Sequence, residues 1–566
     1  MDNSVWQAKP RNEKLFGVLK SKYSKLEAEI LSRRELTDEK ELEEYLSPKF
    51  EGLYDPFLLL NMKKVITRYF SAISKKEKVA IYADYDADGI CSGALLTDIV
   101  KLSFSDFEIY IPDRKLEGYG LKKKAIEFLW KKGVSLIISC DCGISNKEEI
   151  DYAKKLGVDV IVLDHHDPPD YNFSNYYIID PKLKNDKYKD KNICGGGVVY
   201  KFIQAVIIAN QNEKLIKFPE HFAKWSLDLV GIATIADMVP LKKENRIFAK
   251  YGLVVLNKTK RIGIKELVKR SGLDKEIIDT RNVGYVIAPR LNAAGRIDHA
   301  NSSYKLLVSQ DKKEAKTIAS ELNIKNSSRQ ELTNQVYIEA IENAKKESGN
   351  IIVLKSKKWD SGVLGIAASR ITNELNKPTI LMTENKDEIT GSARSIKNFN
   401  IIEAIRKHKD LLITFGGHPQ AAGLTVEKSN FESFKEKMIK HTAKKISKAD
   451  LIKLYEYDVE TDLDNINYSL YKTIELLEPF GMGNKKPIFL LNNLIIEKYN
   501  FVGKKENHLK LNLRSGRKRI SAIKFNIEKN KIENILKKEK LDVLVELSEN
   551  KYMGRSSLEL QLIDLK

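Results

Sequence analysis

The 566-residue sequence is poor in cysteine, with four in the whole chain. So few cysteines exclude a scaffold built on disulfides at this length, and we interpret them as free thiols. The chain also lacks an apolar run of the roughly 18 residues that a membrane helix needs, and its first residues lack the apolar core of a signal peptide. It contains no low-complexity tract and no internal repeat. We therefore expect a cytoplasmic protein of several globular domains.

Acidic residues are outnumbered by basic ones. The chain has 97 Lys and Arg against 78 Asp and Glu, which gives a net charge of +19. Such an excess favours a polyanionic partner such as nucleic acid. A general bias towards Lys, Ile and Asn is the alternative explanation, so the charge alone does not decide the partner.

Short apolar segments rich in β-formers alternate with helical patterns from about residue 79. The segments are KVAIYA (78–83), FEIYIP (107–112), SLIISC (135–140), DVIVLD (159–164) and YYIID (176–180). Helical patterns such as those of residues 122–133 and 146–157 separate them. This alternation predicts a parallel sheet with helices on both faces.

Acids and histidines concentrate where these predicted strands end. In chain order they are Asp84, Asp86, Asp88, Asp141, Asp164, His165 and His166. Ligands of open α/β sheets bind at the carboxyl ends of the strands. Three strands thus deliver metal-type ligands to one edge, which predicts a site there.

The first of these acidic loops, DYDADG, begins like an EF-hand calcium loop. Such a loop needs a Glu at its twelfth position, which is Leu95 here, and a helix before it rather than a strand. Asp88 could instead cap the following helix, but capping does not require three carboxylates. A divalent cation would offset their mutual repulsion, and oxygen ligands with imidazole suit Mn²⁺ or Mg²⁺ better than zinc.

The chain divides into four parts by pattern. We expect an N-terminal segment and a parallel-sheet domain in residues 1–310, a connecting helix in 311–346, and a smaller α/β domain in 347–445. Residues 446–566 alternate apolar and polar positions around Ser515-Gly516, a hairpin signature, and predict a small all-β barrel or sandwich.

Four motifs in chain order carry a resemblance to a known family. DYDADG, SCDCG (139–143), LDHH (163–166) and ATIADMVP (233–240) resemble the successive motifs of the DHH phosphoesterases. Later stretches, among them IPDRKLEGYG, APRLNAAGRI, GSARS, FGGHPQAAG and LEPFGMGNKKPIF, are similar to the single-strand-specific 5′→3′ DNA exonucleases of that family. The resemblance implies a DHH catalytic domain, a DHH-associated substrate-binding domain and a C-terminal OB-fold.

The resemblance also implies two bound divalent ions, Mn²⁺ or Mg²⁺. The implied ligands are Asp84, Asp86, Asp88, Asp141, His165 and Asp237. The implied catalytic residues are Asp141, His165, His166, Arg290, Arg296 and His418. Asp164 would orient an imidazole without binding a metal ion itself. Two such ions would direct water at phosphorus and stabilise the leaving oxygen, while the arginines and His418 offset the charge on the phosphoryl oxygens.

The same resemblance places the substrate. Arg114, Ser392 and Arg394 would bind the DNA 5′-phosphate, which sets the polarity, and Asn292 would lie near the scissile phosphate. A narrow passage between the two α/β domains would exclude duplex DNA. A solvated arginine stays the alternative for Arg114, and a structural histidine for His166.

Further expectations concern the basic residues of the tail and the geometry around the motifs. Basic residues of the predicted tail hairpin either follow the DNA backbone or form a solvated surface. They are Lys510, Arg514, Arg517, Lys518 and Arg519. If the strands stay extended, His165 and His166 should point in different directions, and Cys140 and Cys142 should share one face. Asp237 should lie inside a helix, where a buried acid requires a cation.

These observations and the resemblance together predict a metal-dependent exonuclease that degrades single-stranded DNA. The resemblance implies 5′→3′ polarity, release of 5′-mononucleotides and a role in repair and recombination. A DHH phosphodiesterase or pyrophosphatase for small nucleotides is one alternative, although it would need neither the +19 charge nor the tail. A non-catalytic DNA-binding relative is another, although it would not need to keep the acids. A single-strand-binding protein and a helicase stay open as partners, and we expect a monomer.

Overall fold

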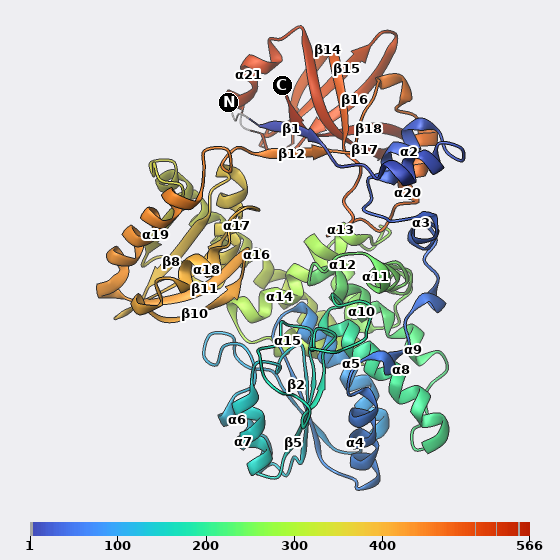
Figure 1. The fold of residues 1–566 in the computed structure, drawn as a ribbon, viewed down its shortest axis with the longest axis vertical. Coiled ribbons are helices and arrows are strands. Elements are labelled where there is room, and N and C mark those ends of the chain that lie inside the picture. The colour runs from blue at the N-terminus through green and yellow to red at the C-terminus, as the bar shows by residue number, and fades with distance from the viewer. Residues whose placement is uncertain (1–3, 504, 528, 553–554) are drawn as a thin grey trace.

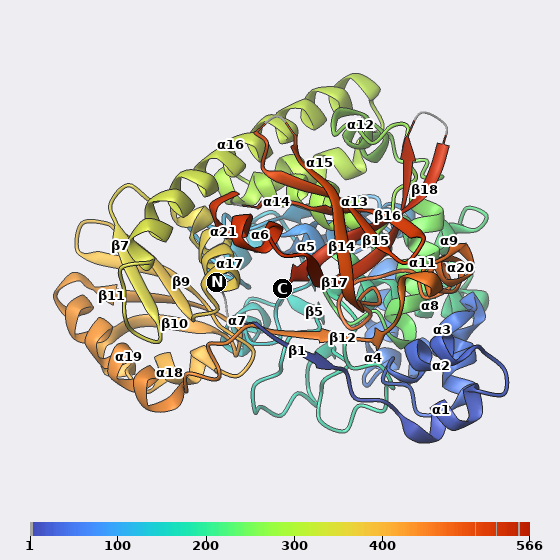
Figure 2. The same cartoon turned by 90° about the horizontal axis from the view of Figure 1, so that it is seen from above.

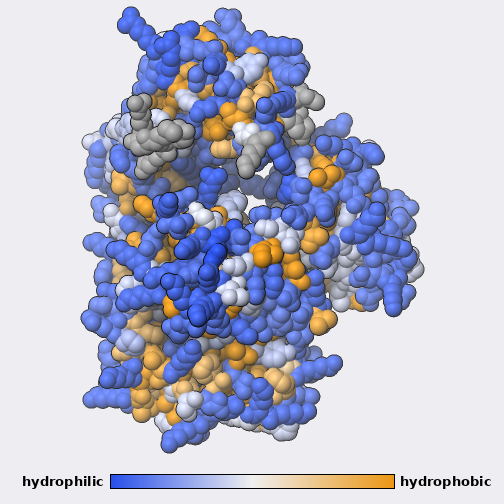
Figure 3. All heavy atoms as spheres, turned by 180° about the vertical axis from the view of Figure 1, so that it is seen from behind, coloured by the Kyte–Doolittle hydropathy of each residue, from blue (hydrophilic) through white to orange (hydrophobic). Residues whose placement is uncertain are grey.

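The computed structural model describes residues 4–503, 505–527, 529–552 and 555–566. Three units surround a central opening (Figure 1). We name them the large α/β unit, the small α/β unit and the barrel unit. A space-filling view from behind shows a narrow gap below the barrel unit, between surfaces that are mostly hydrophilic (Figure 3).

Five parallel strands form the sheet of the large α/β unit, in the order β3-β2-β4-β5-β6. They are β2 (Val79–Ala83), β3 (Phe107–Tyr110), β4 (Leu136–Cys140), β5 (Asp159–Leu163) and β6 (Tyr177–Ile179). These are the five predicted strands, and the predicted parallel sheet is confirmed. The chain runs from β2 outwards to β3 and then returns to β4 on the other side, so the order reverses at β2, where such sheets bind ligands.

Helices cover both faces of this sheet. On one face lie α6 (Lys123–Lys131) and α7 (Lys147–Lys155), and on the other α4 (Met62–Ser74), α5 (Ala87–Ser103) and α8 (Gly195–Glu213). Successive residues of β2 alternate between the two cores, because side chains of a strand point to opposite faces. Further helices extend the second face: α9 (Phe222–Trp225), α10 (Leu227–Ala236), α11 (Lys243–Leu256), α12 (Ile262–Arg270), α13 (Thr280–Asn282), α14 (Ala288–Ile297) and α15 (Asn301–Val308).

The predicted connecting helix is α16 (Lys312–Ala344), which begins with Asp311 as its N-cap. It contacts α12, α14 and α15 of the large unit and α17 of the small one. Seen from above, it runs along one edge of the molecule (Figure 2).

The small α/β unit has a five-stranded mixed sheet in the order β10-β11-β9-β8-β7. Its strands are β7 (Ile352–Ser356), β8 (Thr379–Glu384), β9 (Glu388–Arg394), β10 (Leu412–His418) and β11 (Ala421–Glu427). Its helices are α17 (Leu364–Leu375), α18 (Ile401–Arg406) and α19 (Phe431–Lys445). Residues Ser392 and Arg394 lie on its central strand β9, at the edge that faces the large unit.

The barrel unit is closed. Its strands are β14 (Phe489–Val502), β15 (His508–Ser515), β16 (Lys518–Lys524), β17 (Lys540–Tyr552) and β18 (Arg555–Leu565). β14 pairs with both β15 and β17, so the five strands form a ring, to which β13 (Val459–Glu460) adds. The hairpin is confirmed, because Ser515 pairs with Lys518. The helices α20 (Tyr468–Glu475) and α21 (Lys529–Leu536) complete the unit.

The N-terminal segment shares the core of the barrel unit. β1 (Val5–Ala8) pairs with β12 (Leu454–Tyr457), and apolar residues of α1 (Glu13–Leu19), α2 (Lys25–Ser32) and α3 (Glu39–Leu46) pack with those of the barrel. Buried Arg34 also bonds Asp458 at 2.7 Å. The sequence groups this segment with residues up to 310, and that boundary stays a prediction.

A buried arginine connects the large unit to this shared core. Arg246 of α11 donates to the backbone carbonyl oxygens of Tyr45 (2.6 Å), Leu477 (3.1 Å) and Glu478 (2.7 Å). The carbonyl groups belong to segments 200 or more residues away, so Arg246 fixes the barrel unit against α11. Within the described ranges, no helix is long and apolar enough to span a membrane.

Candidate metal centre and phosphate site

The loop after β2 turns directly into α5. Asp86 is the N-cap of α5, and its carboxylate accepts from the backbone N–H groups of Asp88 (2.9 Å) and Gly89 (3.1 Å). The capping residue is therefore Asp86 and not Asp88. Gly89 is required here, because a Cβ would lie 2.6 Å from the carbonyl oxygen of Asp84.

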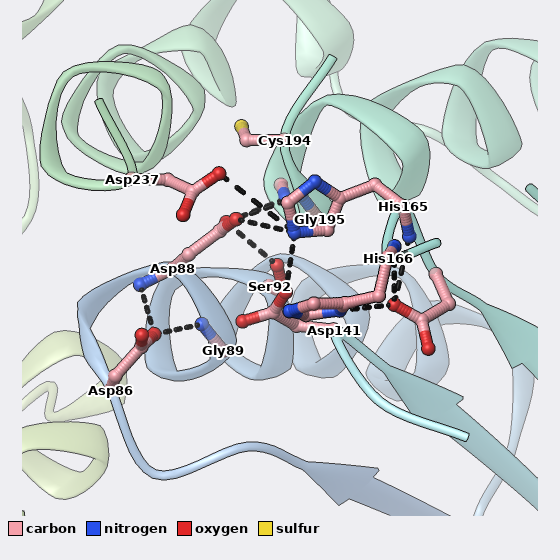
Figure 4. Close-up of polar contacts among 12 residues, drawn as sticks. Asp86, Asp88, Gly89, Ser92, Asp141, His165, His166, Cys194, Gly195 and Asp237 are labelled. Atoms are coloured by element: carbon pink, nitrogen blue, oxygen red, sulfur yellow. Dashed lines mark hydrogen bonds and ion pairs between the residues drawn. The ribbon is translucent and has the colours of Figure 1, made fainter. Parts of the chain in front are cut away.

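Asp88 is held by the start of a second helix. Its carboxylate accepts from the N–H groups of Gly195 and Gly196 at the start of α8, both at 2.7 Å (Figure 4). A side chain at Gly195 would collide with Asp141, since its Cβ would lie 2.8 Å from Oδ1. The glycines thus let α8 approach both acids and present its free N–H groups to Asp88.

Asp141 follows the last residue of β4 in a left-handed conformation, with φ of 60°. The strand therefore stops at Cys140, and Cys142 turns to the opposite side of the sheet. Cys140 packs in the core beneath α5, and Cys142 in the core beneath α6. The prediction that both cysteines share one face is wrong for this reason, while their assignment as buried free thiols is confirmed.

His165 lies in the middle of the acids. Its Nε2 is 3.1 Å from Oδ1 of Asp141, 3.9 Å from Oδ2 of Asp88 and 3.8 Å from Oδ2 of Asp237. Asp237 reaches the cluster from the C-cap position of α10. The prediction that it lies inside a helix is therefore wrong, because the helix ends at this residue.

His166 has a different environment from His165, although the two rings are neighbours with centroids 4.5 Å apart. Their predicted divergence is wrong, because β5 already ends at Leu163. Nδ1 of His166 lies 2.8 Å from Oδ1 of Asp164 and 3.0 Å from the hydroxyl of Tyr119. Asp164 therefore orients an imidazole, as expected, and that imidazole belongs to His166.

The protonation of the cluster follows from burial and crowding. Burial, together with the charge of Asp86, raises the pKa of Asp88 to about 7. Burial and Asp88 raise the pKa of Asp237 to about 8. For Asp84 and Asp141 the same two causes raise the pKa well above its usual value. Carboxylates that resist ionisation when alone are stabilised in their charged form by a cation.

The two histidines shift in opposite directions. Burial and the neighbouring His166 lower the pKa of His165 to about 3, so its imidazole is neutral, the form that binds metals. Burial would lower the pKa of His166 too, but the hydrogen bond to Asp164 and the negative charges of Asp164, Asp237 and Asp84 together outweigh it and raise the pKa to about 9. The pKa of Asp164 falls to about 2, because this hydrogen bond, the charges of His166 and His165 and the N–H group of Ile144 together outweigh the effect of its burial.

Several ligand-type atoms of the cluster are buried without a hydrogen bond in the described part of the chain. They are Oδ1 of Asp84, Oδ1 of Asp141 and Nε2 of His165. Ligand atoms lie within 4.8 Å of one another in three groups: Asp84-Asp86-Asp141, Asp88-His165-Asp237 and Asp141-His165-His166. Oxygen-rich groups with one imidazole are the donor set of Mn²⁺ or Mg²⁺. The residues present therefore fit two divalent ions that share Asp141.

Two of the predicted phosphate ligands, Ser392 and Arg394, lie on β9 of the small α/β unit. Arg394 donates to the hydroxyl of Ser392 at 3.0 Å. Both side chains pack against Gly365 in the first turn of α17, where a Cβ would lie 2.7 Å from Arg394 Nη2. Arg114, from the loop after β3, lies over the ring of Tyr85 at 5.0 Å and is near enough to Arg394 to lower its pKa after burial. The structure thus brings the three predicted residues to one region.

The two predicted arginines of α14 have different neighbours: Arg296 lies near Arg114 and Arg394, whereas Arg290 contacts α16. Burial, then Arg114, Arg329 and Arg394, lower the pKa of Arg296 to about 10, so four arginines lie close together. Arg290 instead donates to Asn323 of α16 at 3.0 Å and to a backbone carbonyl group.

Two residues near the site were missed by sequence reasoning. Arg329 of α16 has a buried Nε that lacks a hydrogen bond among the described residues. Tyr119 contacts His166, and its hydroxyl also donates to the carbonyl oxygen of Asp141 at 3.1 Å. Arg329 lies outside every motif, whereas Tyr119 belongs to IPDRKLEGYG and was quoted without a role.

The remaining predicted residues are less central. The side-chain oxygen of Asn292 accepts from the N–H of Ala87 at 2.8 Å, so it supports the acidic loop. His418 ends β10, is exposed, and lies 3.8 Å from Asp167 beside the DHH motif.

Basic residues of the barrel hairpin are mostly occupied within the chain. Arg514 and Arg519 both pair with Glu497, at 2.9 and 2.8 Å, and Lys510 lies 3.5 Å from Glu559. Lys518 donates to two backbone carbonyl groups. Arg517 lacks an ion pair in the described ranges, so the solvated-surface interpretation fits most of this group better.

Comparisons with known proteins agree with this arrangement. Residues 78–234 match the DHH family, N-terminal domain, residues 348–445 match the DHHA1 domain, and residues 457–564 match the RecJ OB domain. The fold and the carboxylate–histidine cluster define a DHH phosphoesterase.

Curated relatives and solved structures narrow the class. A single-stranded-DNA-specific exonuclease RecJ of Bacillus subtilis is 35% identical over 544 residues, which are 95% of this chain and 67% of the relative. The Haemophilus influenzae RecJ is 30% identical and covers 94% of both chains. RecJ of Thermus thermophilus in complex with Mn²⁺ superposes with a TM-score of 0.84 at 25% identity, over 99% of this chain and 79% of that one. The chain belongs to the RecJ family.

Proposed function

We propose that this protein is a metal-dependent exonuclease that degrades single-stranded DNA from its 5′ end and releases 5′-mononucleotides. The observation that carries the proposal is the buried cluster of acids with His165, in which Asp84, Asp141 and His165 keep ligand atoms without a hydrogen bond among the described residues. Relatives that the chain matches over nearly its whole length are named single-stranded-DNA-specific exonucleases. A role in repair and recombination, and encounters with a single-strand-binding protein and a helicase, belong to the same proposal.

Two divalent ions, Mn²⁺ or Mg²⁺, would be held by Asp84, Asp86 and Asp141 on one side and by Asp88, His165 and Asp237 on the other, with Asp141 common to both. When bound, such a pair activates water and stabilises the leaving oxygen of a phosphodiester. The N–H groups of Gly195 and Gly196 fix Asp88, and the N–H groups of α5 fix Asp86. The protein thus holds these carboxylates rigidly before any ion arrives.

Polarity would come from the phosphate site. Arg114, Ser392 and Arg394 are proposed to bind the 5′-phosphate of the strand, because a guanidinium fork matches phosphate oxygens and the region has no acid partner for Arg394 among the described residues. A terminal monoester carries more charge than an internal diester, so this site would select a strand end.

Positive charge around the cluster would complete the site. Protonated His166, held by Asp164 and Tyr119, is proposed to offset charge on the phosphoryl oxygens. Arg296 is proposed to act similarly from α14, and His418 from the tip of β10. Arg290, which is bonded to Asn323, is proposed to position α14 against α16 rather than to touch the reacting phosphate.

An end-labelling assay tests the proposal. Single-stranded DNA labelled at the 5′ or the 3′ end is incubated with the protein and Mn²⁺ or Mg²⁺, and we expect labelled mononucleotide to appear first from the 5′ end. Asp141→Asn should abolish it. Release from the 3′ end would overturn the polarity. Turnover of dinucleotides without degradation of DNA would favour a small-nucleotide phosphodiesterase, and binding without turnover a non-catalytic relative.

A further inference from the structure

A continuous helical segment links the barrel unit to the metal centre. It consists of α13, a π-helical turn (Val283–Ile287) and α14. Its beginning lies beneath the barrel strands, beside the central opening (Figure 1). Its end reaches the metal loop, where Asn292 accepts from Ala87, and the small α/β unit, where Arg296 donates to the carbonyl oxygen of Gly362 at 3.3 Å. From position 281 to position 296 it spans roughly 22 Å.

One face of this segment is exposed to solvent at its beginning, at Arg281 and Tyr285, and partly buried further on, at Pro289, Asn292 and Arg296. The face consists of Arg281, Tyr285, Pro289, Asn292 and Arg296, at spacings of three and four residues that place them in one row. Residues between them, including Val283, Ile287 and Leu291, are fully buried. The row therefore runs from the barrel unit to the metal ligands as a polar and aromatic surface with a positive charge at each end.

Tyr285 is the unusual member of the row. Its side chain is 78% exposed, whereas the next most exposed aromatic side chain of the described residues, Tyr171, reaches 51%. Across the described ranges, no aromatic ring stacks on Tyr285 and no hydrogen bond satisfies its hydroxyl. An aromatic ring held in water on a rigid helix gains nothing for the fold.

The π-helical turn is centred on this residue. Such turns are rare, have poorer hydrogen-bond geometry than an α-helix, and occur frequently at functional sites. Here the wider turn comes between α13 and α14, and Tyr285 is its middle residue. Exposure and local backbone geometry therefore single out the same residue by independent routes.

We propose that Tyr285 stacks on a base of the single strand as the strand passes from the barrel unit to the metal centre, with Arg281 on a neighbouring phosphate. The proposal rests on the proposed function, because it takes single-stranded nucleic acid as the substrate. The charge of the row complements a polyanion, and the row is continuous with the candidate site. An aromatic face accepts any base, as an exonuclease that degrades every sequence requires.

The position of Tyr285 predicts which lengths of substrate contact its ring. Tyr285 lies 11 residues before Arg296 on the segment, about 16 Å along the helix axis, so the stacked base belongs to a nucleotide several positions after the cleaved bond. Long strands should therefore lose affinity when the ring is removed, whereas a trinucleotide should be hydrolysed at an unchanged rate.

The first experiment compares variants at this position. For Tyr285→Ala we expect Kd for a 20-nucleotide single strand, measured by fluorescence anisotropy in EDTA, to rise about tenfold. With Mn²⁺, KM for that strand should rise similarly while kcat on a trinucleotide stays unchanged. Tyr285→Trp and Tyr285→Phe should retain wild-type values. Tyr468→Ala, which removes a 46% exposed tyrosine from α20, is the matched control and should change nothing.

A second experiment locates the base. Strands that carry one abasic site at successive positions from the 5′ end are bound to the wild-type protein and to Tyr285→Ala. We expect the wild type to lose affinity at one position several nucleotides from the end, and Tyr285→Ala to show no loss there. Equal profiles for the two proteins would overturn the proposal, even if Tyr285→Ala binds more weakly.

Salt dependence separates stacking from phosphate contact. Arg281→Ala should lower the slope of log Kd against log salt concentration by about 0.7, the value for one phosphate contact on a single strand, whereas Tyr285→Ala should leave it unchanged. Different results would refute the proposed function and the stacking of Tyr285. If the wild-type protein degrades no single-stranded DNA, the proposed function is refuted. If the wild-type protein and Tyr285→Ala degrade long single strands equally well, the stacking is refuted.

Discussion

The sheet edge of the large α/β unit and the hairpin of the barrel unit both gather charges of one sign, but the chain treats them differently. In the hairpin, Glu497 pairs with both Arg514 and Arg519. At the sheet edge, Asp84 and Asp141 are buried together and keep an oxygen without a hydrogen bond among the described residues. An ion pair at the surface stabilises little and implies no ligand, whereas unpaired buried carboxylates destabilise the fold and so indicate a missing cation.

The largest effect is expected at Asp141, a buried acid that keeps an oxygen without a hydrogen bond among the described residues. Asp141→Asn should reduce the rate of mononucleotide release by roughly 1,000-fold or more, because the two proposed ion sites would lose the ligand that they are proposed to share. The same substitution should raise the Tm of the metal-free protein at pH 8, because it removes one of several crowded negative charges. Initial rates and thermal melts in EDTA measure the two effects.

Asp228 provides the matched control for this prediction. It is equally buried, but it accepts from Thr259 at 2.6 Å and pairs with Arg261 at 3.2 Å. Asp228→Asn should lower the free energy of unfolding by about 2 kcal/mol and leave metal binding intact. If both substitutions stabilise the metal-free protein, or both destabilise it, the distinction between paired and unpaired acids fails.

The next effect concerns the phosphate site. Arg394→Ala should reduce the preference for 5′-phosphorylated over 5′-hydroxyl strands by roughly 10- to 100-fold, since charge-assisted hydrogen bonds to the phosphate are lost. Competition between the two strands in one reaction gives the ratio directly. Arg370→Ala removes an arginine of α17 that lies over the ring of Tyr337 and should leave the ratio unchanged. A ratio that is the same in all three proteins would exclude the assigned role.

The stabilisation of the fold by a divalent metal ion should depend on pH. In the metal-free protein the pKa of Asp88 is about 7 and that of Asp237 about 8, both above the ordinary value of 3.8. Between these limits each of these two carboxyls binds more proton in the folded state than in the unfolded state, so their contribution to the free energy of unfolding falls as pH rises from about 4 to 8. The gain in Tm on adding Mn²⁺ should accordingly be larger at pH 8 than at pH 6. Melts at both pH values, with and without Mn²⁺, test this, and an equal gain at both would count against it.

The smallest effect is expected in the hairpin. Glu497→Gln releases Arg514 and Arg519, and we expect the affinity for single-stranded DNA at low salt to rise about twofold. Anisotropy with a labelled strand measures it, and Glu506→Gln, which removes a partner of Lys529 elsewhere on the barrel, is the control. A fall in affinity would mean that Glu497 positions the arginines for DNA rather than neutralising them.

Much of the fold and of the metal centre could be predicted from the sequence, because local signals agree with the tertiary structure there. Buried parallel strands are apolar and short, and their carboxyl ends converge, so the motif acids had to meet. The paired hairpin around Ser515-Gly516 was equally visible.

The errors share a cause in the residues just after the strands. Extended geometry was assumed through Cys142 and His166, but β4 ends before Asp141 and β5 ends before Asp164. The left-handed Asp141 and the bond between His166 and Asp164 depend on neighbours from other elements. Sequence patterns predict the strand itself but not the backbone conformation of the residues that follow it, and the site consists of those residues.

Long-range packing was out of reach for another reason. The N-terminal helices share a core with residues more than 400 positions away, and Arg329 reaches the arginine cluster from α16 without belonging to a motif. Neither relation leaves a periodic or compositional signal in the sequence. Tyr285 was likewise invisible, since only the structure shows a tyrosine that is 78% exposed on a helix with a buried back.

A calorimetric titration with Mn²⁺ at pH 8 tests most directly whether the unpaired acids are kept for cations. The account predicts two ions per chain for the wild-type protein, fewer for Asp141→Asn, and an unchanged two for Asp228→Asn. Absence of Mn²⁺ binding to the wild-type protein, or equal binding by all three, would contradict it.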